Sequence, residues 1–323
     1  MADFEPIVAK WMLATAQLDG ENRMGVPLDS VKEESISVRD VSNGNLLKIM
    51  VEKAPGKREE AVFTTVGQLV DCDLPPITWK IVKKAVGGQV LQRAAVTGFK
   101  SAPFLKGLEI LSNLETKLGA AVPRDIPVKA TCTTYAENVK DVALVTSTRY
   151  FTRARKPIPA SDRRPIPSTV DPHGLLARSE NEKTAFCTDN IVHYVKLVDN
   201  QIVVKDPSSF AVGDLIQLGF AMHAYRMFDV EAGPSFVIKL VLRSLLYLDT
   251  PSATKPENAN TVIKRKLIND TYEEQHAKRL RRAANPLADR VFAEVIVAPD
   301  SSDDEDQGGL NLLDLDISGR TGN

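Results

Sequence analysis

Apolar and polar positions alternate along several stretches of the chain. Alternation from Ser35 to Thr65, interrupted by Asn43-Gly44 and by a turn sequence at Ala54–Lys57, predicts strands joined by hairpin turns. Stretches rich in Val, Thr and Tyr predict further strands, and the last of them turns at Asp199-Asn200. These later strand regions are Val128–Tyr135, Val142–Phe151 and Ile191–Val204.

Other stretches repeat their apolar residues at helical spacing. The clearest runs from Ala102 to Leu118, where leucines recur every three or four residues and mark one apolar face. By the same criterion we expect helices at Pro6–Leu18, Pro76–Val96, Ala102–Leu118, Val212–Phe228, Ser235–Leu248 and, with a polar composition, Asn258–Ala284. Together these elements predict an α+β fold, a mixed helical and antiparallel β body.

A proline-rich segment marks the clearest boundary in the chain. Arg153–Pro172 contains five prolines, each of which lacks a backbone donor and disfavours helical geometry in the residue before it. The segment therefore predicts an extended loop or linker between an N-terminal α+β region, residues 1–152, and a mainly helical region, residues 173–298. Residues 299–323 combine low hydrophobicity with dense negative charge, which predicts a disordered tail.

Bulk composition is that of a globular protein. Of the 323 residues, 43% are hydrophobic and 26% are charged, so most of the chain can bury a core. The most apolar region, Phe210–Leu248, carries several charged residues and predicts no membrane span. We also expect no signal peptide. The cysteines Cys72, Cys132 and Cys187 lie far apart, which predicts free thiols in a reducing compartment.

The sequence predicts no catalytic, cofactor or metal site. None of the four histidines stands in a zinc-binding pattern, and neither phosphate-binding glycine motif is present. His173 lies in a turn sequence, and His223 lies on an apolar segment where a partnered core histidine is the favoured interpretation. An enzyme of unfamiliar type remains an alternative.

A basic segment next to the proline-rich loop is the first candidate binding site. Guanidinium groups bind phosphates through paired donors, and the adjacent Tyr150 and Phe151 could stack on bases. The candidate RNA-binding residues here are Arg149, Arg153, Arg155, Lys156, Arg163 and Arg164. A solvated linker is the open alternative, and an aromatic content of 6% argues against an extended array of stacking platforms.

A second basic region lies in the predicted polar helix. Its candidate RNA-binding residues are Lys264, Arg265, Lys266, Lys278, Arg279, Arg281 and Arg282. Because the basic residues form two blocks about a dozen residues apart, they also match a bipartite nuclear-import signal. A solvated helix face is the third interpretation.

The acidic tail carries two features of its own. Ser301 and Ser302 are each followed by an acidic residue three positions on, which predicts phosphorylation by acid-directed kinases. Leu312, Leu313 and Leu315 predict a docking arm for another copy of the chain or for a partner protein, and the same residues match a clathrin-box pattern.

The arrangement of Arg149–Arg164, Lys264–Arg282 and Asp300–Asp306 resembles the viroplasm matrix proteins of the phytoreoviruses. The resemblance implies a non-enzymatic protein that binds single- and double-stranded RNA, self-associates, and forms the matrix of viral factories in the host cytoplasm. Other viral or host proteins are further expected partners. The alternative is an adaptor or movement-type protein that recruits host partners through its tail.

Overall fold

A computed structural model describes most of the chain between residues 24 and 249. The described residues are 24–42, 44–54, 56–83, 89–154, 156–198, 201–229 and 233–249. The expected helices at Pro6–Leu18 and Asn258–Ala284, the basic residues 264–282 and the acidic tail lie outside these ranges. Among the described residues, no helix is both long and apolar enough to cross a membrane.

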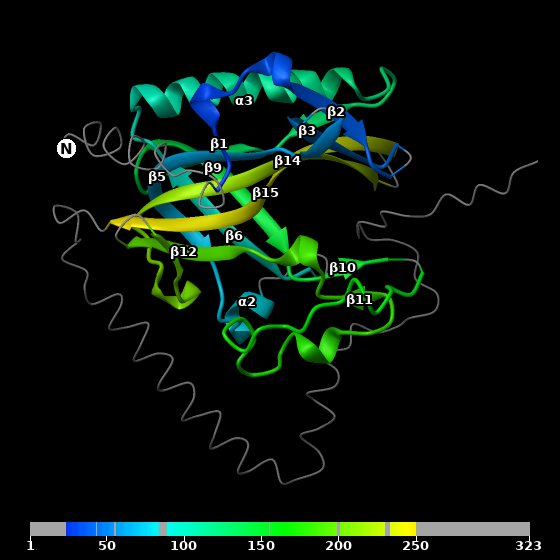
Figure 1. The fold of residues 1–323 in the computed structure, drawn as a ribbon, viewed down its shortest axis with the longest axis vertical. Coiled ribbons are helices and arrows are strands. Elements are labelled where there is room, and N and C mark those ends of the chain that lie inside the picture. The colour runs from blue at the N-terminus through cyan, green and yellow to red at the C-terminus, as the bar shows by residue number, and fades with distance from the viewer. Residues whose placement is uncertain are drawn as a thin grey trace, which may run out of the picture. The chain divides into compact units, whose positions relative to one another are not determined.

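Five strands form a closed barrel at the centre of the fold (Figure 1). They are β5 (Val62–Asp73), β6 (Leu91–Thr97), β9 (Asp141–Arg149), β14 (Leu215–Asp229) and β15 (Gly233–Asp249). β5 pairs antiparallel with β6 and with β14, β6 with β9, and β14 with β15. A parallel bridge between β15 and β9 completes the ring. The strand connectivity is that of a five-stranded Greek-key barrel of the OB-fold type.

Further strands extend the barrel into a sheet of thirteen strands among the described residues. The eight additional strands are β1 (Val26–Pro27), β2 (Ile36–Asp40), β3 (Leu46–Ala54), β4 (Lys57–Glu60), β7 (Val128–Ala130), β8 (Thr133–Ala136), β12 (His193–Val198) and β13 (Gln201–Val204). The predicted hairpins are confirmed, since β2 pairs antiparallel with β3, β3 with β4, and β12 with β13. Gly44 and Gly56 adopt positive φ angles of 83° and 77° at two of these turns.

The predicted helices at Val212–Phe228 and Ser235–Leu248 are wrong. These segments are β14 and β15, the two longest strands described, and they pair along their whole length. In β14, Phe220, Met222 and Ala224 alternate into the core while His223 and Tyr225 take the opposite face. Within the expected mainly helical region, the regular structure of the described residues between 173 and 249 therefore consists of strands and single helical turns.

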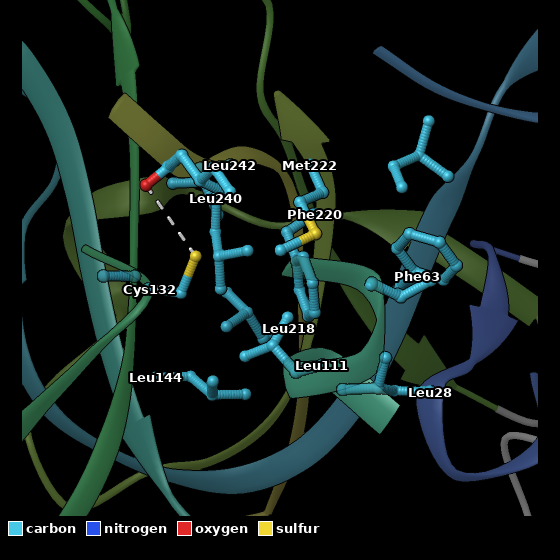
Figure 2. Close-up of a cluster of buried hydrophobic side chains, with 14 of the residues drawn as sticks. Leu28, Phe63, Leu111, Cys132, Leu144, Leu218, Phe220, Met222, Leu240 and Leu242 are labelled. Carbon is cyan, nitrogen blue, oxygen red and sulfur yellow. Dashed lines mark hydrogen bonds between the residues drawn. The ribbon is translucent and has the colours of Figure 1, made fainter. Parts of the chain in front are cut away.

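One long helix, α3 (Ala102–Ala120), packs on the barrel, as Figure 1 shows. This helix confirms the prediction from the leucine spacing. Leu111, Leu114 and Leu118 are at most 2% exposed and join the main hydrophobic cluster with residues of β14 and β15. Figure 2 shows Leu111 close to Leu218 of β14 within this cluster. The helix therefore closes off one side of the barrel interior with apolar side chains.

The helix expected over Pro76–Val96 is largely replaced by other structure. Among the described residues of this segment only α2 (Trp79–Lys83) is helical, and the end of the segment belongs to β6. Alternate residues of β6 enter the core, where Ala94 and Val96 are fully buried. Three small apolar residues in a row, Ala94, Ala95 and Val96, are as compatible with a strand buried on both faces as with a helix.

After Arg153, the described residues of the proline-rich segment form turns and bends without a helix or a named strand. At the start of this segment, β10 (Thr152–Arg153) pairs with β11 (Thr184–Ala185). Single helical turns occur elsewhere in the chain. These 3-10 turns are η2 (Leu28–Ser30), η3 (Glu33–Ser35), η4 (Ala177–Ser179), η5 (Thr188–Asn190) and η6 (Pro207–Ser209). The cysteines Cys72, Cys132 and Cys187 are all free thiols.

Candidate functional site

A groove on the outer face of the barrel collects positively charged side chains from four elements. Its volume is about 270 Å³, and β3, β9, β14 and β15 contribute to its walls together with the residues around β10 and η5. The cations that line it are Lys48, Arg149, Arg153, Lys239 and Arg243, and we name this surface the basic groove. Two aromatic side chains, Phe151 and Tyr225, also line it.

Strand register explains why these residues meet. His223 of β14 stands between Lys48 of β3 and Lys239 of β15, because both are its cross-strand partners. Paired residues on neighbouring strands point to the same face of a sheet, so the three side chains form one row. Lys239 and Arg243 are four residues apart on β15 and therefore also share this face, opposite the core residues Leu240 and Leu242.

One carboxylate, Glu60, organises part of the basic groove. Its Oε1 lies 2.9 Å from Lys48 Nζ and 2.7 Å from His223 Nε2, and its Oε2 lies 2.7 Å from an Nη atom of Arg243. Arg243 also donates from Nε to Glu60 Oε2 and from its other Nη to the backbone oxygen of Asp189, both at 2.8 Å. Burial favours the neutral carboxyl, but the bond from His223 and the charges of Arg243 and Lys48 outweigh it, so the pKa of Glu60 is well below its ordinary value.

His223 is fully partnered, as the sequence favoured. Its ring is 3% exposed and lies between Glu60 and the hydroxyl of Tyr225, which is 2.9 Å from Nδ1. Burial lowers the pKa of His223 below its ordinary value, although the hydrogen bond to Glu60 opposes this. In the neutral ring Nε2–H donates to Glu60 while Nδ1 accepts from the tyrosine hydroxyl, so both ring nitrogens are satisfied.

The burial of His223 predicts that its contribution to the stability of the folded protein depends on pH. Because the folded protein holds His223 at a lowered pKa, it binds fewer protons than the unfolded chain once the pH falls below about 6.5. Stability from this site is therefore present at neutral pH and is lost as the pH falls. We expect the thermal midpoint of the parent to exceed that of His223→Gln at pH 7.5 and the gap to narrow towards pH 5. A gap that stays constant over this range would contradict the prediction.

Arg149 and Lys239 differ from the other cations of the groove. Both are half-buried, and neither has an ion pair with a carboxylate among the described residues. The guanidinium carbon of Arg149 lies 5.7 Å from the centre of the Tyr225 ring. Burial lowers the pKa of Arg149 and of Lys239, and the charge of Arg149 lowers that of Lys239 further. A bound anion would offset the free-energy cost of burying these two charges and would reduce the repulsion between them.

No protein-family model and no curated protein matches this chain. Two solved structures are similar to it at low sequence identity. One is gp2.5, a single-stranded DNA-binding protein encoded by bacteriophage T7, with a TM-score of 0.38 and 11% identity over 61% of this chain and 96% of that chain. The other is the single-stranded DNA-binding protein from bacteriophage Enc34, with a TM-score of 0.27 and 7% identity over 70% of this chain and 98% of that chain. Both TM-scores are under 0.5, so the function proposed below depends on the residues of the groove itself.

The structure places the predicted basic residues of the middle segment in different environments. Arg149 and Arg153 line the basic groove, and Arg155 lies outside the described residues. Lys156 is exposed on the loop. Arg163 donates to the backbone oxygens of Ile158 and Glu182 at 3.1 and 2.7 Å, and Arg164 donates to those of Ser161 and Arg163 at 2.7 and 3.0 Å. These two guanidinium groups brace the loop, and their role in binding stays a prediction.

Four residues of the groove were missed by the sequence interpretation. These residues are Lys48, Tyr225, Lys239 and Arg243. Strand pairing brings Lys48, which lies far away in the sequence, beside the other three. The one available signal is the spacing of Lys239 and Arg243 in an otherwise apolar stretch, where a charged pair four residues apart marks a face turned away from the core. The other predicted sites, in residues 264–282 and 299–323, lie outside the described residues and stay predictions.

Proposed function

We propose that this protein is a non-enzymatic binder of single-stranded nucleic acid and that the basic groove is its binding site. The observation that carries the proposal is the pair of half-buried cations, Arg149 and Lys239, without a carboxylate partner in the described residues. Cations in such a setting bind phosphate, since a phosphate supplies the missing negative charge and accepts several hydrogen bonds. The rings of Phe151 and Tyr225 lie in the same groove.

The combination of cations with rings favours a single strand. Sequence-independent binding of single strands depends on a positively charged groove that follows the backbone and on aromatic side chains that stack on bases. In a duplex the bases stack on one another and present no free face, so Phe151 and Tyr225 would have no partner. The position of the groove agrees with this, because OB-type barrels bind oligonucleotides over the face of their second and third strands. In this chain those strands are β6 and β9, and Leu91 and Arg149 line the groove from them.

A salt series tests this proposal. For single strands the logarithm of the binding constant falls with the logarithm of salt concentration by roughly 0.7 per neutralised phosphate. If Arg149 and Lys239 alone neutralise phosphates the slope is about −1.4, and if all five groove cations do it is about −3.5. We expect fluorescence anisotropy with labelled oligonucleotides to give a slope between these values. No binding at low salt, or binding without salt dependence, would overturn the proposal.

The same assay shows which kind of nucleic acid the protein prefers. Oligonucleotides of thymidine, uridine and a matched duplex distinguish DNA, RNA and double-stranded ligands. The resemblance to viroplasm matrix proteins favours RNA as the natural ligand and self-association as a second activity. Both remain proposals, and the tail residues Leu312, Leu313 and Leu315 expected to support assembly lie outside the described residues.

A further inference from the structure

A chain of hydrogen bonds connects Glu60 to one of the rings of the basic groove. Glu60 accepts from His223 at 2.7 Å, and Nδ1 of His223 lies 2.9 Å from the hydroxyl of Tyr225. The rings of His223 and Tyr225 are 5.6 Å apart between centroids and inclined at 62°. Because His223 is 3% exposed and held at both nitrogens, the tyrosine hydroxyl is bonded to a rigid partner. Tyr225 is thereby fixed at one end while its ring lines the groove.

Simple electrostatics predicts an unfavourable role for Glu60. A carboxylate beside a site for phosphates repels the ligand, and Glu60 also neutralises Lys48 and Arg243, which would otherwise attract it. Its presence there therefore needs a contribution that offsets this repulsion. The hydrogen-bond chain supplies one, since a ring already held in its binding orientation loses less rotational freedom when a base stacks on it.

We propose that Glu60 is a positioning residue for base stacking, acting through His223 on Tyr225. This inference rests on the proposed function of the basic groove and assigns the stacking position within it. The aromatic side chain that contacts the base is Tyr225, and Arg149 lies over the same ring at 5.7 Å. Glu60 and His223 do not touch the ligand. Their effect is to keep the tyrosine hydroxyl bonded to Nδ1 of His223, so that the ring is presented in one orientation.

Two ligands separate this role from the charge of Glu60. One is a thymidine strand of about 16 nucleotides, the upper end of the site size of an OB fold, and the other is an abasic strand with the same number of phosphates. The dissociation constant of the abasic strand divided by that of the thymidine strand measures the contribution of the bases to affinity. Electrostatic effects act on both strands alike, whereas positioning of Tyr225 acts only on the strand that has bases.

We expect the full-length parent to bind the thymidine strand more tightly than the abasic strand. Tyr225→Ala should reduce the ratio by about fivefold or more, and Glu60→Gln and Tyr225→Phe by roughly threefold. Glu60→Gln should bind the abasic strand at least as tightly as the parent, because the substitution removes a negative charge. If Glu60→Gln does not fold, Tyr225→Phe and His223→Gln test the hydrogen-bond chain instead, because both variants keep Glu60 and the groove cations.

The remaining outcomes each contradict a different claim. An unchanged ratio in folded Glu60→Gln, or equal losses for both strands, overturns the positioning role of Glu60. A parent that binds both strands equally overturns the assignment of Tyr225 and leaves the phosphate contacts intact. A parent that binds neither strand overturns the proposed function of the basic groove.

Discussion

Reversing the charge of Arg149 and Lys239 together should reduce affinity for single-stranded nucleic acid by on the order of a hundredfold at 0.1 M salt. Each of these cations is half-buried in the basic groove without a carboxylate partner in the described residues. Counterion release makes each neutralised phosphate of a single strand worth about a factor of five at that salt concentration, and the repulsion from two glutamates adds to the loss. The salt slope of Arg149→Glu with Lys239→Glu should also become shallower by about 1.4.

A matched variant on the neighbouring loop controls for net charge. Lys156→Glu with Arg164→Glu changes the charge by the same amount at exposed positions that do not line the groove. We expect a reduction of less than about fivefold, because loss of long-range attraction between exposed charges is screened by salt. Equal losses in the two double variants would mean that the phosphates follow the loop, as the sequence alone suggested for Lys156 and Arg164. Thermal melting of both variants establishes that each is folded.

Local patterns in the sequence were sufficient to predict the hairpins and the long helix. The tight turn predicted at Asn43-Gly44 needs a residue that can adopt a positive φ. Gly44 has a φ of 83° between β2 and β3. In α3, apolar residues recur at Leu111, Leu114 and Leu118, which strand alternation cannot place on one face. These features depend on neighbours close in sequence, so a single chain reveals them.

The two longest strands could not be told from helices by the same reasoning. In β15, Lys239 and Arg243 are four residues apart, and such a pair shares a face in a helix and in a strand. The intervening Leu240, Val241 and Leu242 are all buried. Leu240 and Leu242 belong to the core, whereas Val241 lies between Lys239 and Arg243 on the face of the groove. A strand covered on both faces is apolar without interruption and loses the alternation that identifies it.

The candidate site was predictable only in part for a related reason. Arg149 and Arg153 lie in the segment that the clustering of arginines indicated, and both line the basic groove. Lys48 and Lys239 reach it through pairing with the same residue of β14, His223, which the sequence does not encode locally. Strand pairing brings together residues that are almost two hundred positions apart in the sequence. Clusters of charged residues along the chain therefore reveal only those site residues that lie in one segment.

Truncation of Leu114 to alanine should lower the free energy of unfolding by about 2–5 kcal/mol. Leu114 is 0% exposed at the centre of the apolar face of α3 and belongs to the main hydrophobic cluster. Removing its isobutyl group loses burial and leaves a cavity between the helix and the barrel, which the closed ring of strands cannot easily collapse to fill.

Leu105 on the same helix provides the control, since it is 49% exposed and the two substitutions are chemically identical. Leu105→Ala should change stability by less than about 0.5 kcal/mol, because alanine and leucine have similar helix propensity and little surface is buried there. Urea denaturation of both variants, compared at equal m-value, measures the difference. Equal destabilisation of the two variants would show that α3 does not pack on the barrel through the face that includes Leu114. A large loss confined to Leu114→Ala would establish that this face stabilises the barrel from whose outer surface the basic groove is formed.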